Sequence, residues 1–436
     1  MKRKALWISI IGILLIGFAC LFCYRYFNRQ KQIEQKKHTG LVSEDFPVQD
    51  IKHQSKNIYE DAYQAETDTQ LQIMKDNHSY TIEDPLLVWN PYGTNTGSFY
   101  YYGISKQDSY VVCEVTCNNG SVIKHRLKND SDSGVTKTHE YLITGLAPGL
   151  KNHFSLAFYD AGNNLIHTYQ YTVTLKKDKQ IPAITKVEKG NSKSSLTDGL
   201  FAVLGHDKSK AKNIYYYDNN GICRGKTPLD DYRTDRILTI DGKIVYSYSL
   251  TDIAFVNRLG KVEKTLSLGK YELHHDFMYD EKRNELLCLV NDTDKDTIED
   301  VLISVNIETG KIKKLVDFEK MMKSMRKRSV QRKGGKNTYG GTELDWLHLN
   351  SLDMINDKDA VFSSREESVI IKINNIYENP SIDYLIHSGS LYKGTKYEKL
   401  LLKQKGNFVG HAGQHTITVE HDASLPNGQY YLFMYN

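Results

Sequence analysis

Between residues 80 and 175, hydrophobic and polar positions alternate in short runs, which is the pattern of strands with one buried face. The runs read SFYYYGI, YVVCEVTC, SVIKHRL, HEYLITGL, HFSLAFYD and LIHTYQYTVTL. Turn-forming sequences such as Asn118-Asn119-Gly120 and Pro148-Gly149 separate them, at the spacing of a two-sheet fold. The pattern predicts an N-terminal β-sandwich domain of the immunoglobulin-like type over residues 80–175.

From residue 196 onward, strand-like runs recur on a longer period, after a Lys- and Ser-rich linker over 176–195. Three segments open with a histidine and continue as strand, turn and strand; they start at His275, His348 and His415, at intervals of 73 and 67 residues. Such a repeat, with four strands and an insertion, fits propeller blades, which are about 40–50 residues long when compact. We expect an all-β chain that ends in a β-propeller over 196–436.

The amino terminus shows a third pattern. Residues 5–24 form an uncharged apolar run of 20 residues, flanked by Lys2-Arg3-Lys4 and Arg25, long enough to span a bilayer. We expect a cytoplasmic tip at 1–4, a transmembrane signal anchor at 5–24, and a polar stalk over 25–79 with a helix from Ile58 to Met74. The alternatives are a cleaved signal peptide, which lacks a good small-x-small site here, and a lipoprotein through Cys20. The anchor predicts a single-pass protein of the cell membrane whose C-terminal domains lie outside the cytoplasm.

Charge and cysteine content narrow the function classes. The net charge is +4, but residues 1–40 carry +7, so the remainder carries −3. A body this close to neutral is not a strong electrostatic ligand for nucleic acid, and we interpret the basic run 322–336 as a solvated insertion. Outside the apolar run, Cys113, Cys117, Cys223 and Cys288 lie in strand-like surroundings. We interpret these four as buried small hydrophobic residues, although pairing among them stays open.

The repeated histidines are the candidate chemistry. The first strand of a blade lies nearest the propeller axis, so His275, His348 and His415 would converge there, and Arg365 lies in the second strand of the His348 blade. Imidazoles with a guanidinium would bind a tetrahedral oxyanion and supply a nucleophile or an acid near neutral pH. Each histidine could instead be structural, and Arg365 could form a surface ion pair with Glu366 or Glu367.

Other chemistries have weaker support. No carboxylate obviously joins the histidines, which argues against a catalytic divalent metal, although a His-only zinc site stays open. The segment from Gly221 to Thr227 has one residue too few between its glycines for a phosphate loop. HExxH and GxSxG do not occur. We therefore expect neither a metal nor a cofactor.

Four motifs in this order resemble bacterial arylsulfate sulfotransferases: HHDF, DWLHLNSLD, SSREESVIIKI and GQHTITV. Residues 80–175 are also similar to that family's N-terminal domain through DPLLVWNPYGTNTGSFYYYG. The resemblance implies transfer of a sulfuryl group from a phenolic sulfate ester to a phenol, without an adenylylated sulfate donor, so the expected partners are these two substrates.

The resemblance also implies residue roles. His415 would be the nucleophile and form a sulfohistidine, while Arg365 would clamp the sulfate oxygens and His348 would share that task or handle the phenolic proton. Asn350 would support the site by hydrogen bonding. One residue of the His274–His275 pair would line the site, and the turn alignment favours His275.

Two departures from the family lead to the alternative function. The chain has no cysteine after Cys288, where periplasmic relatives carry a disulfide near the nucleophile. We count four blades and two strands of a fifth, so we expect a propeller of the six-bladed type that is incomplete in this chain. The alternative is therefore a catalytically inactive, truncated, membrane-anchored propeller that binds ligands or partners. A homodimer stays open.

Overall fold

The fold was determined as a computed structural model and is all-β apart from a few helices. The structure describes residues 39–41, 48–117, 122–131, 133–181, 188, 190–191, 199–204, 212–230, 234–330, 335–337, 341–407 and 409–436. The predicted anchor at 5–24 and most of the predicted linker at 176–195 lie outside these ranges. Within them, no helix is both long and apolar enough to cross a membrane.

The chain divides into two compact units, one of Met1–Ala202 with Tyr215–Lys226 and one of Val203–Ile214 with Thr227–Asn436. In the first unit, the sheet elements are β1 (Thr39–Leu41), β2 (Leu86–Trp89), β3 (Phe99–Cys117), β4 (Val122–Arg126), β5 (Thr136–Ile143), β6 (Lys151–Tyr159) and β7 (Leu165–Thr174). The long strand β3 pairs with β2 and β5 through its first half and with β4 and β6 through its second half.

Alternation along the strands builds the core of the first unit. The odd-numbered residues of β3 from Val111 to Cys117 are buried, because successive side chains of a strand point to opposite faces. Val111, Cys113 and Val115 join residues of β5 and β6 in one hydrophobic cluster, namely Tyr141, Ile143, Phe154, Leu156 and Phe158. All four described cysteines are buried, as the sequence predicted, and they are unpaired, which answers the question of pairing that the sequence left open.

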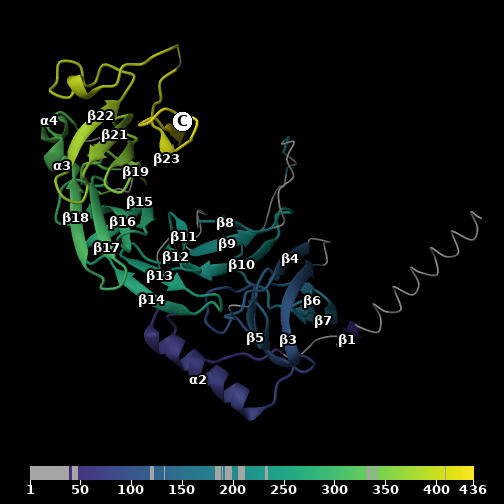
Figure 1. Cartoon of the computed structure of the whole chain (residues 1–436). Coiled ribbons are helices and arrows are strands. Elements are labelled where there is room, and N and C mark those ends of the chain that lie inside the picture. Colours follow the sequence, from purple (N-terminus) through teal and green to yellow (C-terminus); the bar gives the residue numbers. More distant parts are fainter. Residues whose placement is uncertain are drawn as a thin grey trace, which may run out of the picture. The chain divides into compact units, whose positions relative to one another are not determined.

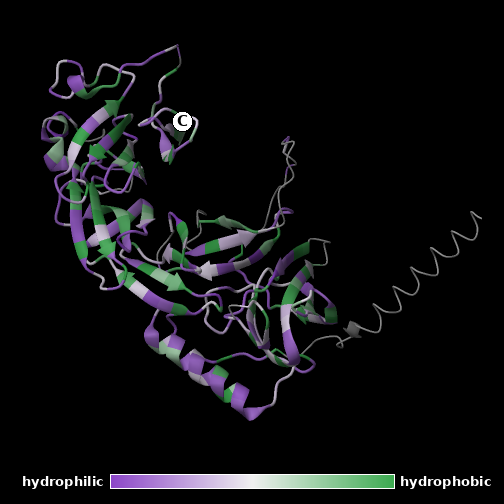
Figure 2. Ribbon diagram, viewed as in Figure 1, coloured by the Kyte–Doolittle hydropathy of each residue, from purple (hydrophilic) through white to green (hydrophobic). Residues whose placement is uncertain are grey.

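The helix α2 (Asp61–Asn77) corrects the expectation of a stalk for the described part of residues 25–79. It begins and ends three residues later than predicted, and Tyr63, Gln64, Thr67 and Leu71 on it are buried. Thr67 donates a hydrogen bond to the carbonyl of Pro91 (3.2 Å), and Lys75 pairs with Glu140 (2.6 Å). Figure 2 shows a mostly hydrophilic helix, so a narrow apolar stripe and these polar contacts hold it on the first unit.

A three-stranded sheet of order β10-β9-β8 follows the first unit's sheet in sequence, and most of β9 and β10 belongs to that unit. Its strands are β8 (Phe201–Val203), β9 (Asn213–Tyr217) and β10 (Cys223–Pro228).

The second unit consists of antiparallel sheets in which each strand pairs with the next along the chain. Three have four strands: β11 (Ile237–Ile240), β12 (Lys243–Ser247), β13 (Asp252–Val256) and β14 (Val262–Ser267); β15 (Tyr271–Asp280), β16 (Glu285–Asp292), β17 (Val301–Asn306) and β18 (Ile312–Asp317); β19 (Leu349–Met354), β20 (Ala360–Ser364), β21 (Val369–Asn374) and β22 (Ser381–Ile386). A further sheet holds β23 (His415–Glu420) and β24 (Tyr431–Tyr435). Figure 1 shows these sheets following one another in chain order.

Each of these sheets packs on the next because its inner strands are apolar on both faces. In β16, Leu286, Cys288 and Val290 face the β11–β14 sheet, whereas Leu287 and Leu289 face the β19–β22 sheet. In β20, Phe362 faces the β15–β18 sheet, whereas Val361 faces the β23–β24 sheet. Continuous apolar runs such as ELLCLV therefore mark strands between two sheets.

Short helices lie between β18 and β19, namely α3 (Phe318–Met321) and α4 (Lys323–Arg326), and the 3-10 helix η1 (Glu398–Leu400) lies between β22 and β23. Met322 and Met325 at the start of the basic run are buried in the core between the second and third four-stranded sheets. This part of the run packs against the second unit, so the expectation of a solvated insertion fails there.

Candidate functional site

The first strands of three successive sheets place the candidate residues. β15 contacts β19, and β19 contacts β23. His275 lies in β15, His348 immediately precedes β19, and His415 opens β23. The pairing register of each strand shifts at this point, between Leu273 and Phe277, between Leu349 and Ser351, and between His415 and Thr418. Bulges of this kind re-aim side chains next to functional sites.

Backbone strain gathers at the same place. His275, Glu299, His348 and Thr416 have φ values of 55°, 57°, 50° and 56°, which is the left-handed region that residues with a side chain rarely adopt. Each such residue costs about 1–3 kcal/mol and persists only where its surroundings hold it. These strained residues are concentrated around the histidines. The fold therefore holds these side chains in fixed orientations, although the strained backbone lowers its stability.

The structure brings the three predicted histidines together. The Nε2 atoms of His275 and His348 lie 3.0 Å apart, and their ring centroids are 4.9 Å apart. The ring of His415 lies 6.1 Å from that of His275, centroid to centroid. Arg365 is also adjacent: its backbone N–H donates to the carbonyl of His348 (3.0 Å), and its Cγ lies 4.0 Å from where a Cβ on Gly413 would stand.

The hydrogen bond of His415 fixes which of its nitrogens is free. Its Nδ1 lies 3.1 Å from the carbonyl oxygen of Gly413. A carbonyl can only accept, so Nδ1 carries the hydrogen and the lone pair is on Nε2. Burial lowers the pKa of His415, an effect that the nearby His275, Arg365 and His348 reinforce and the Gly413 carbonyl partly opposes. The neutral form of the His415 imidazole is therefore favoured near pH 7, with a free lone pair on Nε2.

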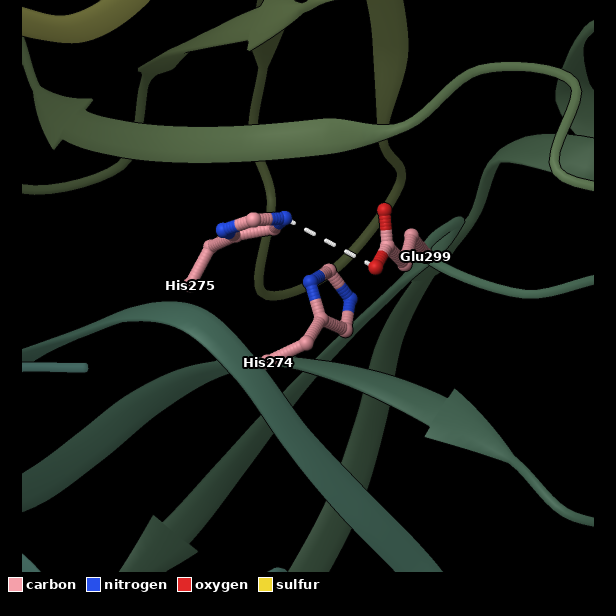
Figure 3. Close-up of side chains that lie close together, drawn as sticks. All are labelled: His274, His275 and Glu299. Carbon is pink, nitrogen blue, oxygen red and sulfur yellow. Dashed lines mark ion pairs between the residues drawn. The ribbon is translucent and has the colours of Figure 1, made fainter. Parts of the chain in front are cut away.

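Two buried carboxylates join the histidines, which corrects the sequence-based statement that no carboxylate does so. Glu299 is fully buried; its Oε1 lies 3.6 Å from Nε2 of His275, and its Oε2 lies 2.5 Å from Nδ1 of His348. Asp345 accepts a hydrogen bond from the same Nδ1 (2.8 Å). Figure 3 shows Glu299 facing the rings of His274 and His275.

These carboxylates set the charge of the cluster. Burial opposes protonation of His348, but its hydrogen bonds to Asp345 and Glu299 outweigh burial and raise the pKa of His348 above its usual value. Burial would likewise raise the pKa of Glu299, but its contacts with His275 and His348 hold that pKa well below the ordinary value. The surroundings thus favour the ionised form of Glu299 and the protonated form of His348, whereas those of His415 favour its neutral form.

The structure separates the two histidines of the HHD motif. His275 faces the rings of His348 and His415, whereas His274 is 4% exposed and lies beneath it, with the two ring centroids 5.5 Å apart. Burial lowers the pKa of His274 to about 3, against the opposing effect of Glu299. The main chain of Val290 lies near its ring, but neither ring nitrogen has a partner in regular hydrogen-bond geometry.

Gln414 and Asn350 position the strand that carries His415. Nδ2 of Asn350 donates to the main-chain oxygen of Gln414 (2.8 Å). The buried side chain of Gln414 donates to Oγ of Ser363 (3.1 Å) and to the carbonyl oxygens of Ser364 (3.0 Å) and Val369 (3.2 Å). Asn350 therefore supports the site through the backbone next to His415.

Arg365 takes part in two interactions. Its Nη2 donates to Oε1 of Glu366 (2.6 Å), the surface pair that the sequence left open, and lies 3.6 Å from Oδ2 of Asp345. A quarter of its side chain is exposed. Asp345 thus lies within reach of both His348 and Arg365, and the guanidinium still has donors available for an oxyanion.

The comparisons with known proteins identify the family. The family model described as Arylsulfotransferase (ASST) matches residues 185–436, more than half of the chain, and the chain belongs to this family. No curated protein matches the chain.

Three of the solved structures that resemble the chain share little sequence identity with it. These are Kluyvelomyces marxianus Hsv2 (8% identity, TM-score 0.24, 55% of this chain and 62% of that one), Saccharomyces cerevisiae Sqt1 (11%, 0.23, 65% and 66%) and a chain of a Mitotic Checkpoint Complex (9%, 0.28, 66% and 74%). The chain thus spans less than two thirds of the length of the first two. Likenesses this weak bear on neither the fold nor the function.

Sequence reasoning missed Glu299, Asp345 and the anchoring role of Gln414. Asp345 lies three residues before His348 within DWLHLN, so its proximity to the histidine could have been suspected. Glu299 lies in the connection between β16 and β17, 24 residues after His275, and no spacing in the sequence indicates its contact with two histidines.

Proposed function

We propose that this chain moves a sulfuryl group from a phenolic sulfate ester to a phenol through a sulfohistidine on His415, without a nucleotide donor. One observation carries the proposal. In a chain of the arylsulfotransferase family, the hydrogen bond from Nδ1 of His415 to Gly413 leaves the Nε2 lone pair free, and the ring stands beside His275 and Arg365.

In the first half-reaction, Nε2 of His415 attacks the sulfur, an N–S bond forms, and the bond from sulfur to the phenolic oxygen breaks. The sulfur is electrophilic but shielded by negative oxygens, so these must be neutralised as the neutral imidazole approaches. Arg365 and the protonated His348 would bind those oxygens, with His275 as a further ligand. The cationic His348 would also protonate the leaving phenolate, and such general acid catalysis contributes about 10²- to 10⁴-fold.

In the second half-reaction, the acceptor phenol attacks the same sulfur and the N–S bond breaks. The phenol's proton passes to the imidazole that gave one up in the first half, which restores the starting state. Glu299 and Asp345 would hold His348 in one tautomer and orientation throughout, as carboxylates do for catalytic histidines. Asn350, given a supporting role by the resemblance, would act through Gln414, and His274 would support His275 from beneath.

The finer fold and the location are also proposals. Sheets that share cores in chain order, with their first strands adjacent, support blades of a β-propeller of the six-bladed type. The single core between the two halves of the β3 sheet supports an immunoglobulin-like sandwich. An anchor at residues 5–24, with the C-terminal domains outside the cytoplasm, rests on the sequence alone.

The test is to trap the intermediate. The full-length chain is mixed with 4-nitrophenyl sulfate, denatured rapidly in alkali to preserve an N-sulfo bond, and analysed by peptide mass spectrometry. We expect one sulfuryl group on the peptide that contains His415, and none in His415→Gln. The matched control is His421→Gln, a histidine six residues further on whose Nε2 bonds the carbonyl of Ile355; it should retain the adduct.

The outcomes separate the two functions. An adduct on another residue would refute His415 as the nucleophile. Binding of the aryl sulfate by a folded chain, with no adduct and no nitrophenol released, would refute the transferase proposal and support the alternative of an inactive ligand-binding module.

A further inference from the structure

A different chemistry is also available beside the sulfuryl site. One imidazole nitrogen of His274, one of His275 and one carboxylate oxygen of Glu299 lie within 4.8 Å of one another, and Figure 3 shows the three groups turned toward a common point. The geometry points to a binding site for a divalent metal ion of the zinc class, held by His274, His275 and Glu299.

His274 carries this inference. Its side chain is nine-tenths buried or more, and neither ring nitrogen has a hydrogen-bond partner of regular geometry. Buried polar groups are almost always satisfied, and a buried donor or acceptor without a partner costs about 1–3 kcal/mol. Coordination of a metal ion through one ring nitrogen would satisfy this side chain.

The ligand set selects the metal. Two imidazoles and one carboxylate, with a fourth position open, are typical of zinc sites that exchange a ligand. Ca²⁺ and Mg²⁺ prefer oxygen ligands alone. A fourth ligand atom is near, because Nε2 of His348 lies 3.0 Å from Nε2 of His275. The buried carboxylate of Glu299 would then be neutralised by a divalent cation, rather than only by its contacts with His275 and His348.

A cavity gives the ion a route to the site. It has a volume of about 570 Å³ and is bordered by both His274 and Glu299. Its remaining charged lining consists of Asp235, Glu272, Asp292, Glu343 and Lys295. Carboxylates therefore outnumber the single lysine, and a cleft lined by one sign of charge raises the local concentration of the opposite ion.

The site shares His275 with the proposed sulfuryl chemistry. A metal ion on Nε2 of His275 withdraws that nitrogen from the sulfate oxygens, so occupancy should slow transfer. This consequence rests on the proposed function, whereas metal binding does not, and the two are measured separately.

The experiment measures binding directly. The full-length chain is freed of metal with a chelator and titrated with Zn²⁺ against a chromophoric zinc indicator, with Mg²⁺ and Ca²⁺ as comparison ions. We expect one zinc ion per chain and no competition from Mg²⁺ or Ca²⁺. Glu299→Gln and His274→Leu should each weaken binding by more than about 10²-fold, since loss of a group that only hydrogen-bonds a metal ligand already costs about 10- to 100-fold. His421→Gln, outside the cluster, should bind as the unaltered chain does.

A second measurement needs no variant. Co²⁺ bound in place of Zn²⁺ should give visible absorption bands typical of a low-coordinate N/O site, and added Zn²⁺ should abolish these bands. Absence of zinc binding by the folded chain, or zinc binding that survives both Glu299→Gln and His274→Leu, would overturn the inference. Zinc binding without any effect on 4-nitrophenyl sulfate turnover would retain the metal site and remove only its regulatory consequence.

Discussion

Replacing Asp345 with asparagine should slow sulfuryl transfer about 10- to 100-fold while leaving the fold intact. Asp345 is 1% exposed; its Oδ2 accepts a hydrogen bond from Nδ1 of His348 at 2.8 Å and lies 3.6 Å from Nη2 of Arg365. Asparagine keeps the shape and an acceptor oxygen, but it removes the charge that both cationic groups of the proposed site face.

The magnitude follows from that single charge. A hydrogen bond to a charged group contributes about 1.5–3 kcal/mol, against about 0.5–1.5 kcal/mol for a neutral one. The difference, with the weakened hold on Arg365, comes to about 1.4–2.7 kcal/mol of transition-state stabilisation. Each 1.36 kcal/mol is tenfold in rate, which gives the expected range.

The assay follows nitrophenol release from 4-nitrophenyl sulfate in the presence of a phenol acceptor, with thermal unfolding recorded in parallel. The matched control is Asp357→Asn, which removes an exposed aspartate that pairs with Lys282 at the surface and should change the rate less than twofold. Equal rates for Asp345→Asn and the unaltered chain, at an unchanged unfolding temperature, would refute the role given to this carboxylate.

Two further predictions concern stability of the first unit. His139 is fully buried, and burial lowers its pKa to about 4 from 6.5. The unfolded chain therefore binds a proton at this histidine more readily than the folded chain does. The free energy of unfolding should fall as the pH drops from 6.5 toward 4, by about 2 kcal/mol between pH 7 and pH 5. Urea unfolding at both pH values should show this loss in the unaltered chain and less of it in His139→Gln; equal losses would contradict the assignment. Arg224→Met should destabilise by about 3–5 kcal/mol, because Asp218, 2.7 Å from Nε of the buried Arg224, would keep a buried charge without its cation. The exposed Lys124, replaced by methionine, should cost under about 1 kcal/mol in the same urea assay, and similar values for the two variants would contradict the argument.

Local pattern was sufficient for the strands and for several of the side chains that lie together at the candidate site. Alternation identified the strands of the first unit, and runs apolar on both faces identified strands such as β16 and β20, because both periodicities are direct consequences of strand geometry. The spacing of His275 and His348, with Arg365 and the GQH motif, also indicated which side chains would meet, since strands of successive sheets repeat the same path.

Only the tertiary structure showed what those residues contact. Glu299 lies in the loop between β16 and β17, has a left-handed backbone conformation, and contacts His348 beside the next sheet. Gln414, which precedes β23, donates a hydrogen bond to Ser363 in β20. The polar helix α2 looked like part of a stalk, yet it packs on the first unit through a few side chains. Periodicity reports which face of an element is buried, but not which distant group lies against it. The charge of His348 and the choice between His274 and His275 depend on distances that no local pattern contains.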